Sequence, residues 1–238
     1  MIEVKNLAFS YRKKTVLRDV SFSVENGGAV CIVGANGAGK TTLLKIMASL
    51  AVPDKGSVEF DGSNIDEFAM RYRKNLGYLP EKIALYNDMS VKKYLSYRAA
   101  IKGEPAKRIR RRVSEAMALC GLEEYAKNRI GALSLGWQKR VAFADALLLR
   151  PRVLLLDDFL NGLDCSMRSG LGDIIKSAAA FSSVVVTGHE IADFSRWAKR
   201  FIVLKDGVIE KEVVVREEDR SSAVSEVTQA LLEKEARL

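Results

Sequence analysis

The part of this 238-residue chain best suited to chemistry is a glycine-rich run that reads GANGAGKT over residues 34–41. It lies between an apolar stretch, 29–33, and a helix-like stretch, 41–50, the setting that a phosphate-binding loop requires. Glycines let the backbone approach phosphate oxygens, which successive N–H groups at the helix N-terminus then bind. Lys40 can neutralise the β- and γ-phosphates, and the Thr41 hydroxyl can ligate Mg²⁺. A turn that only joins strand to helix leaves the lysine and the extra glycines unexplained. The predicted nucleotide contacts are Gly34, Asn36, Gly37, Ala38, Gly39, Lys40, Thr41 and Thr42.

A second candidate is a pair of carboxylates, Asp157 and Asp158, directly after the apolar run 153–156. At the carboxyl edge of a parallel sheet, beside a phosphate loop, Asp157 can hold a magnesium ion and Asp158 can orient an attacking water. Alternatively, two acids after a strand can simply cap the next turn. The phosphate loop upstream favours the interpretation as a metal and water site.

Between these two signals, residues 133–140 read LSLGWQKR. Ser134 and the Gly136 backbone stand at the start of a predicted helix, where they can form an anion site, and Ser134 is also an ordinary N-cap candidate. With a phosphate loop upstream and an acidic strand downstream, this LSxGxQ-like motif resembles the signature of nucleotide-binding subunits of the ATP-binding cassette (ABC) superfamily. The similarity covers essentially the whole chain. It implies that Ser134, Gly136 and Gln138 contact the ATP held by the phosphate loop of a second protomer.

The resemblance implies further nucleotide and metal contacts. Tyr11 matches the aromatic residue that stacks on adenine, with Val16 beside it, although a surface tyrosine after a strand is a rival interpretation. Glu81, in the segment GYLPE, stands where the family has a glutamine that touches magnesium and senses the membrane partner. A carboxylate can still ligate the metal. The Glu81 variant resembles small bacterial exporter-type ATPases of the drug and polysaccharide kind.

Two more positions complete the resemblance. The stretch 161–164 matches the loop that crosses the dimer interface, and His189 matches the switch histidine that contacts the γ-phosphate. A solitary histidine is more often structural, but its place after an apolar strand favours the functional role. Asp158 departs from the pattern, because the family has a glutamate there, one methylene longer. A misplacement of about 1 Å can cost on the order of 10²-fold in rate, so we expect slowed hydrolysis and intact ATP binding.

The pattern of the chain predicts the elements that position these residues. Residues 2–9 and 20–24 alternate as half-buried strands do, whereas runs such as 29–33 are continuously apolar, as in a parallel sheet covered on both faces. Residues 205–207 predict a hairpin turn into 208–215. Further strands are expected at 57–60, 76–79, 153–156, 184–186 and 201–204, and helices at 105–120 and 137–149, within a mostly helical stretch from 90 to 150.

Pattern and resemblance together predict an α/β fold, a P-loop NTPase (RecA-like) core with an antiparallel β subdomain and an inserted α-helical subdomain. We expect a single ABC ATPase domain over 1–238. Its nucleotide-binding core comprises 1–84 and 151–220, its helical subdomain with the signature motif 85–150, and its C-terminal helix 221–238.

Composition excludes several other classes of protein. Apolar residues make up 48% of the chain, without a continuous run of about 18 that could span a bilayer, and the N-terminus lacks the features of a secretory signal. Three scattered cysteines predict neither a disulfide framework nor a zinc site. The net charge of +8, densest at 107–112, fits a solvated basic surface, although such an excess also permits binding to nucleic acid or an anionic membrane.

The resemblance implies a cytoplasmic ATPase, peripheral at the inner face of the cell membrane, whose head-to-tail dimer drives a separate permease with ATP and Mg²⁺. Membrane association is expected only through that permease, and no nucleic acid partner is expected. Two alternatives remain. The chain could be a catalytically weak regulatory partner in a heterodimer, or a soluble ABC ATPase outside transport, acting on nucleic acid or a protein complex.

Overall fold

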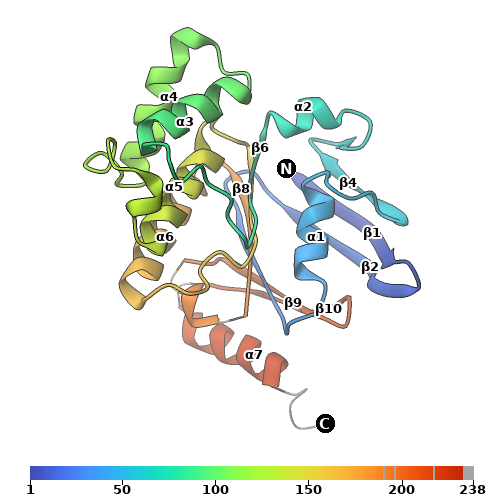
Figure 1. Ribbon diagram of the computed structural model, residues 1–238. Coiled ribbons are helices and arrows are strands. Elements are labelled where there is room, and N and C mark those ends of the chain that lie inside the picture. Colours follow the sequence, from blue (N-terminus) through green and yellow to red (C-terminus); the bar gives the residue numbers. More distant parts are fainter. Residues whose placement is uncertain (190, 196, 217, 233–238) are drawn as a thin grey trace.

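The computed structural model describes residues 1–189, 191–195, 197–216 and 218–232, and Figure 1 shows their arrangement. Within this part of the chain, the strands form a smaller sheet in the order β2-β1-β4-β5 and a larger sheet in the order β10-β9-β3-β8-β7-β6. The strands are β1 (Ile2–Tyr11), β2 (Lys14–Val24), β3 (Ala29–Val33), β4 (Lys55–Phe60), β5 (Ser63–Asn64), β6 (Leu76–Leu79), β7 (Val153–Leu156), β8 (Ser183–Gly188), β9 (Arg200–Lys205) and β10 (Val208–Val214).

The larger sheet brings the candidate residues to one edge. Strands β6, β7, β8, β3 and β9 pair in parallel, and β10 pairs antiparallel to β9. Every residue of β3, β7 and β8 is buried, which explains their continuous apolar sequences. Since parallel strands end at the same edge of a sheet, the segments that follow β3, β7 and β8 meet there. The phosphate loop, Asp157 with Asp158, and His189 are those segments.

The smaller sheet is antiparallel and carries Tyr11. Strand β1 pairs with β2 and β4, and its alternating pattern buries Ile2 and Val4 in a cluster shared with α1 (Lys40–Met47). At the far end of β1, Tyr11 lies opposite Lys14 of β2. The sheet therefore places the predicted adenine contact at the tip of its first hairpin.

The insertion between β6 and β7 is helical. In Figure 1, α3, α4 and α5 gather on the side of the molecule away from β1, β2 and β4. Helix α4 follows Pro105 and ends at Leu119. Its C-cap residue Cys120 precedes Gly121, whose positive φ of 63° suits a helix C-terminus. The helices other than α1 are α2 (Ala69–Arg73), α3 (Val91–Ile101), α4 (Ala106–Leu119), α5 (Leu135–Leu147), α6 (Cys165–Ala178) and α7 (Arg220–Leu232), with short 3₁₀ turns at Ile130–Ala132 and Ile191–Asp193.

Most expected elements are confirmed with shifted ends. The helix expected over 41–50 is α1 and ends at Met47, while the strand expected over 2–9 continues to Tyr11. The basic run 107–112 lies mostly on the exposed side of α4, as expected. The expected C-terminal helix 221–238 is observed as α7, and residues 233–238 lie outside the described residues. Within the described residues, no helix is both long and apolar enough to cross a membrane.

Candidate functional site

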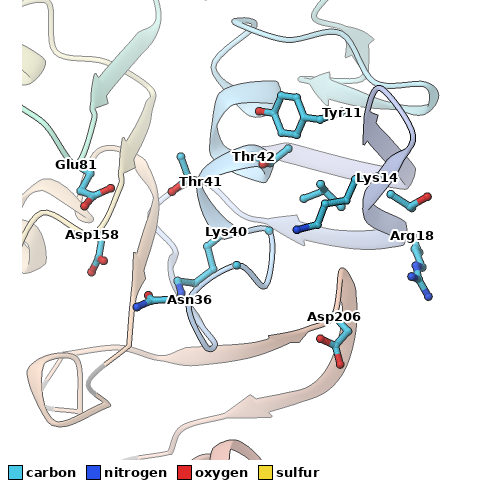
Figure 2. A pocket seen from close by; sticks show the side chains of 14 residues that line it. Tyr11, Lys14, Arg18, Asn36, Lys40, Thr41, Thr42, Glu81, Asp158 and Asp206 are labelled. Carbon is cyan, nitrogen blue, oxygen red and sulfur yellow. The ribbon is translucent and has the colours of Figure 1, made fainter.

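A cleft of about 790 Å³ opens at the edge where the parallel strands end (Figure 2). Figure 2 shows Glu81 and Asp158 on one side of Lys40 and Thr41, and Tyr11 on the other. The cleft thus joins the hairpin of the smaller sheet to the acidic edge of the larger one. The predicted site residues that line it are Tyr11, Val16, Asn36, Gly37, Gly39, Lys40, Thr41, Thr42, Glu81 and Asp158.

Local backbone geometry shapes the phosphate loop between β3 and α1. Gly37 and Gly39 adopt positive φ angles of 83° and 107°, a region that favours glycine. A Cβ atom on Gly34 would lie 2.2 Å from the carbonyl oxygen of Leu204, so the loop can approach β9 only without a side chain there. The Lys40 ammonium donates to the carbonyl oxygens of Gly34 at 2.6 Å and Ala35 at 3.1 Å. These contacts close the loop around its own lysine.

The Lys40 ammonium lies among the carboxylates of the cleft. Burial lowers the pKa of Lys40, and the carboxylates of Asp158, Asp157 and Glu81 act in the opposite direction. The side of the cleft that carries Glu81 and Asp158 is therefore rich in negative charge. A triphosphate bound there needs a further cation between its oxygens and these carboxylates.

Asp157 lies beneath the cleft floor in a network of hydroxyl groups. It is 1% exposed, and its Oδ1 accepts hydrogen bonds from Thr41 Oγ1 at 3.1 Å and Thr187 Oγ1 at 2.8 Å. Burial raises the pKa of Asp157, while the two hydroxyl bonds act to lower it. Thr187 Oγ1 also accepts the backbone N–H of Asp158 at 3.0 Å. One threonine of β8 therefore contacts both residues that follow β7, the carboxylate of Asp157 and the backbone of Asp158.

The donor set of the cleft fits a magnesium ion that shares its ligands with a nucleotide. Mg²⁺ in such sites uses one or two carboxylates, a hydroxyl, phosphate oxygens and water. Thr41 and Asp157 are already joined by a hydrogen bond, and Glu81 lines the same cleft. Across the described residues, no group of three or more His, Cys, Asp and Glu side chains could hold a metal alone. The arrangement suits Mg²⁺ that arrives with a triphosphate.

Asp158 and His189 lie close together after β7 and β8. His189 Nδ1 lies 3.4 Å from Asp158 Oδ1, and the two side chains are 42% and 18% exposed. Asp158 has a positive φ of 44°, which is uncommon for a residue with a side chain. Strained backbone of this kind clusters at functional sites.

The signature residues lie apart from this cleft. Ser134, Gly136 and Gln138, at the start of α5, are absent from the described residues that line it. Ser134 occupies the N-cap position of α5, as predicted, although its hydroxyl makes no capping hydrogen bond with the described residues. The Gln138 side chain instead donates to the Leu133 carbonyl at 3.0 Å. The Ser134 hydroxyl is thus not committed to its own helix.

Two predicted contacts lie behind the loop surface. Ala38 is 5% exposed and packs into the core, and Gly34 accepts the Lys40 ammonium through its carbonyl oxygen. Neither is among the described residues that line the cleft. Both residues therefore support the loop on the side that faces away from the cleft.

Sequence reasoning missed other residues at the hairpin end of the cleft. Arg18 donates its backbone N–H to the Gly207 carbonyl at 2.7 Å, which ties β2 to the turn between β9 and β10. The available signal was the alternation of β2, which places Lys14, Val16 and Arg18 on a common face near Tyr11. The lining residues that were missed are Lys14, Thr15, Arg18 and Asp206. Thr187, whose hydroxyl donates to the Asp157 carboxylate, was missed as well.

Comparison with known proteins gives matches along most of the chain. A family model described as "ABC transporter" matches residues 17–161. The Bacillus subtilis "Uncharacterized ABC transporter ATP-binding protein YxlF" is 30% identical over 209 residues, 88% of this chain and 69% of that protein. The Pasteurella multocida "Spermidine/putrescine import ATP-binding protein PotA" is 31% identical over 220 residues, 91% of this chain and 59% of that protein. The chain thus spans 59–69% of the length of these two relatives.

Solved structures share the whole architecture. The cbiO1 protein from Clostridium perfringens, described as part of the ABC transporter complex cbiONQ, superposes with a TM-score of 0.84 and 25% identity, covering 99% of this chain and 96% of that one. The cassette MJ0796, in a dimeric post-hydrolysis state bound to ADP and Pi, gives 0.80 and 27%, covering 91% and 99%. The predicted fold class, an α/β core with an antiparallel sheet and helices, is confirmed.

Proposed function

The chain belongs to the ABC transporter family and is an ATPase of that family, and on this premise we propose that it hydrolyses MgATP in a head-to-tail dimer to drive a separate membrane permease. One observation carries the proposal. The cleft gathers the phosphate loop, Tyr11 and the acidic edge, while Ser134 and Gly136 lie elsewhere on the same chain. A second protomer can supply these two residues to the nucleotide and complete the site.

In this proposal each residue has a defined task. Tyr11 stacks on adenine, with Val16 beside it, and the phosphate loop with Lys40 binds the β- and γ-phosphates. Thr41, Asp157 and Glu81 hold Mg²⁺, which neutralises phosphate charge when it is bound. Of the loop residues predicted from sequence, those that line the cleft contact the nucleotide, Asn36, Gly37, Gly39, Lys40, Thr41 and Thr42. Gly34 and Ala38 shape the loop from the side away from the cleft.

The hydrolytic step is in-line transfer of the γ-phosphoryl group from ATP to water, in which the bond to the bridging oxygen breaks and ADP leaves. Asp158 orients the attacking water and accepts its proton, and His189 holds the γ-phosphate on the same side. Ser134, Gly136 and Gln138 of the second protomer supply hydrogen-bond donors where negative charge builds up in the transition state. The 3.4 Å contact between His189 and Asp158 supports their joint action on one phosphoryl group.

The division of the chain follows from these tasks. Residues 1–84 and 151–220 form the nucleotide-binding core, 85–150 present the signature motif, and the C-terminal helix begins near 221. We expect the permease to dock around Glu81 and the following helical segment. That assembly places the ATPase at the inner face of the cell membrane. We propose that the permease exports its substrate, and this direction rests on Glu81 alone. A relative of similar identity is named as an import protein.

A second candidate function is favoured by Asp158. Its carboxylate is one methylene shorter than the family's glutamate and sits on strained backbone. A subunit of this kind can close on ATP and leave most of the hydrolysis to a heterodimeric partner. Both functions use the same ATP cleft, so turnover separates them.

The test of the main proposal is MgATP turnover as a function of protein concentration. A site completed by a second protomer makes the rate rise more steeply than linearly. Ser134→Arg should remove turnover and leave ATP binding intact, whereas Ser222→Arg, on an exposed position of α7, should change neither. A strictly linear rate that survives Ser134→Arg contradicts the composite site. ATP binding with turnover near background favours the regulatory function.

A further inference from the structure

Helix α5 contains a buried lysine that the proposed function does not use. Lys139 is 5% exposed, and its ammonium donates to the backbone carbonyl oxygens of Phe159, at 2.6 Å, and Asn161. A buried ammonium is costly unless hydrogen bonds replace its water shell. Burial accordingly lowers the pKa of Lys139. Both of its acceptors belong to the segment that follows Asp158.

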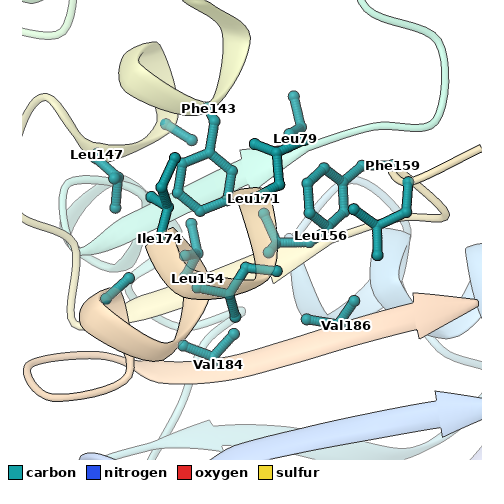
Figure 3. Packing of buried hydrophobic residues seen from close by; sticks show 14 of the residues in the cluster. Leu79, Phe143, Leu147, Leu154, Leu156, Phe159, Leu171, Ile174, Val184 and Val186 are labelled. Atoms are coloured by element: carbon teal, nitrogen blue, oxygen red, sulfur yellow. The ribbon is translucent and has the colours of Figure 1, made fainter. Parts of the chain in front are cut away.

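That segment, residues 159–164, is fixed at its ends by other contacts. Figure 3 shows Phe159 in the apolar cluster that also holds Phe143 of α5, and their ring centroids are 5.8 Å apart. At the other end, Asp164 caps α6 by accepting the backbone N–H of Met167 at 2.8 Å. Between them, the Lys139 ammonium bridges two carbonyl groups. Without the ammonium, the carbonyl oxygens of Phe159 and Asn161 lose this hydrogen-bond donor.

The surroundings of the ammonium point to the acidic edge of the cleft. Asp158 and Glu81 act to raise the pKa of Lys139, and Arg168 acts to lower it. The lysine therefore feels the field of the two carboxylates that line the cleft next to Lys40. Lys139 is thus a second cation under the influence of these carboxylates, and its ammonium contacts the backbone of the segment that follows Asp158.

We propose that Lys139 is a positioning residue for ATP hydrolysis, because its bonds to the Phe159 and Asn161 carbonyls fix the segment that sets the direction of the Asp158 carboxylate. The inference rests on the proposed role of Asp158. Lys139 also lies close in sequence to the signature serine, since Ser134 is the N-cap residue of α5 and Lys139 belongs to the first turns of the same helix.

The first test compares Lys139→Met with a matched control, Lys102→Met. Lys102, at the C-cap of α3, is less buried than Lys139. Its ammonium also donates to a backbone carbonyl, that of Asp145, and pairs with the Asp145 carboxylate at 3.0 Å. For Lys139→Met we expect kcat to fall about 10- to 100-fold, because a small misplacement of Asp158 is enough for such a loss. KM and the Kd for MgATP should stay within about threefold in both variants, and kcat should be unchanged in Lys102→Met.

A double-mutant cycle asks whether Lys139 acts through Asp158. In an Asp158→Asn background, where the carboxylate is already lost, Lys139→Met should cause no further fall in single-turnover rate. A full additional fall there shows that the lysine acts by another route and overturns the inference. Lys139→Gln keeps a neutral donor and should retain an intermediate kcat, which provides a second variant if the methionine protein does not fold.

Amide hydrogen exchange tests the same inference without turnover. Exchange over residues 158–164 should become about tenfold faster or more in Lys139→Met and stay unchanged in Lys102→Met, because only the first variant frees that segment. Unchanged exchange in a folded Lys139→Met protein overturns the inference even if the parent hydrolyses ATP slowly. A parent chain with no turnover at any concentration contradicts the proposed function instead, so the two failures are distinguishable.

Discussion

The phosphate loop and the acidic edge face each other across one cleft but are built in different ways. The loop is one contiguous run, 34–41, whose shape comes from glycine backbone angles and from bonds between Lys40 and its own carbonyl groups. The acidic edge, defined here as Glu81, Asp157, Asp158 and His189, is assembled from side chains that follow three different strands.

Because the two sides of the cleft are built differently, ATP binding and hydrolysis can vary independently. A substitution in the loop alters a backbone geometry that few residue types other than glycine can adopt. A change at the edge alters the length or charge of one side chain, as at Asp158 and Glu81, and leaves the surrounding strands in place. We therefore expect the loop to control affinity for ATP and the edge to control turnover.

Lys40→Ala should give the largest effect and tests the loop side of the comparison. It removes the buried ammonium at the centre of the loop and its charge-assisted bonds to phosphate. We expect the Kd for MgATP to rise about 100-fold or more. Calorimetric titration measures this, with Lys45→Ala, an exposed position of the same helix, as the control. Unchanged affinity in Lys40→Ala would remove the basis for the site assignment.

The edge should respond to Asp158→Glu in the opposite sense. The added methylene lets the carboxylate reach further into the cleft, so kcat should rise about 10-fold or more. The Kd for MgATP should stay within about threefold. Asp66→Glu, at an exposed position outside the cleft, is the matched control. If Asp158→Glu brings no gain, the aspartate already positions water well and the hydrolysis is not damped.

The same contrast explains what the sequence could predict. Tyr11, Glu81 and His189 are assigned from a resemblance, whereas Asp158 is predicted from its place after an apolar run. The parallel strand order brings Glu81, Asp158 and His189 to one edge. Thr187 was missed because its role depends on the pairing of β8 beside β7, which no local pattern encodes. Lys139 was missed because a lysine near the start of a helix normally indicates solvent exposure, and only the packing of α5 against the 159–164 segment buries it.

Helix and strand ends could be predicted only within a few residues. Helix α1 begins at Lys40 rather than at Thr41, because the left-handed Gly39 is its N-cap residue. The predicted N-cap position of Ser134 is observed, but without a side-chain hydrogen bond to the helix. Cap preference is a local tendency, and at this position the hydroxyl takes no such bond with the described residues.

Gly34→Ala should lower the free energy of unfolding more than it lowers the affinity for MgATP, because Gly34 matters for the path of the loop backbone. Its Cβ would meet the Leu204 carbonyl oxygen at 2.2 Å, so β9 or the loop must shift. We expect the free energy of unfolding to fall by about 2 kcal/mol in urea denaturation. Gly62→Ala is the control, because Gly62 has a positive φ of 80° but open space around it, and should cost about 1 kcal/mol. Equal losses in the two variants contradict the close approach at Gly34.

Tyr11→Ala should give the smallest effect, because stacking adds to binding that the phosphate loop already provides. The side chain is 48% exposed at the tip of β1, and its ring meets Phe9 edge-on with centroids 4.8 Å apart. Loss of one stacked base costs on the order of 1–3 kcal/mol, so we expect about tenfold weaker MgATP binding. Tyr11→Phe should retain the affinity, and Tyr97→Ala, a similarly exposed tyrosine of α3, should leave it unchanged. Inorganic tripolyphosphate has no base, so its affinity should be the same in the parent and in Tyr11→Ala. If Tyr11→Ala weakens tripolyphosphate as much as MgATP, the tyrosine supports the loop rather than the adenine, and the affinity of the cleft resides in the loop alone.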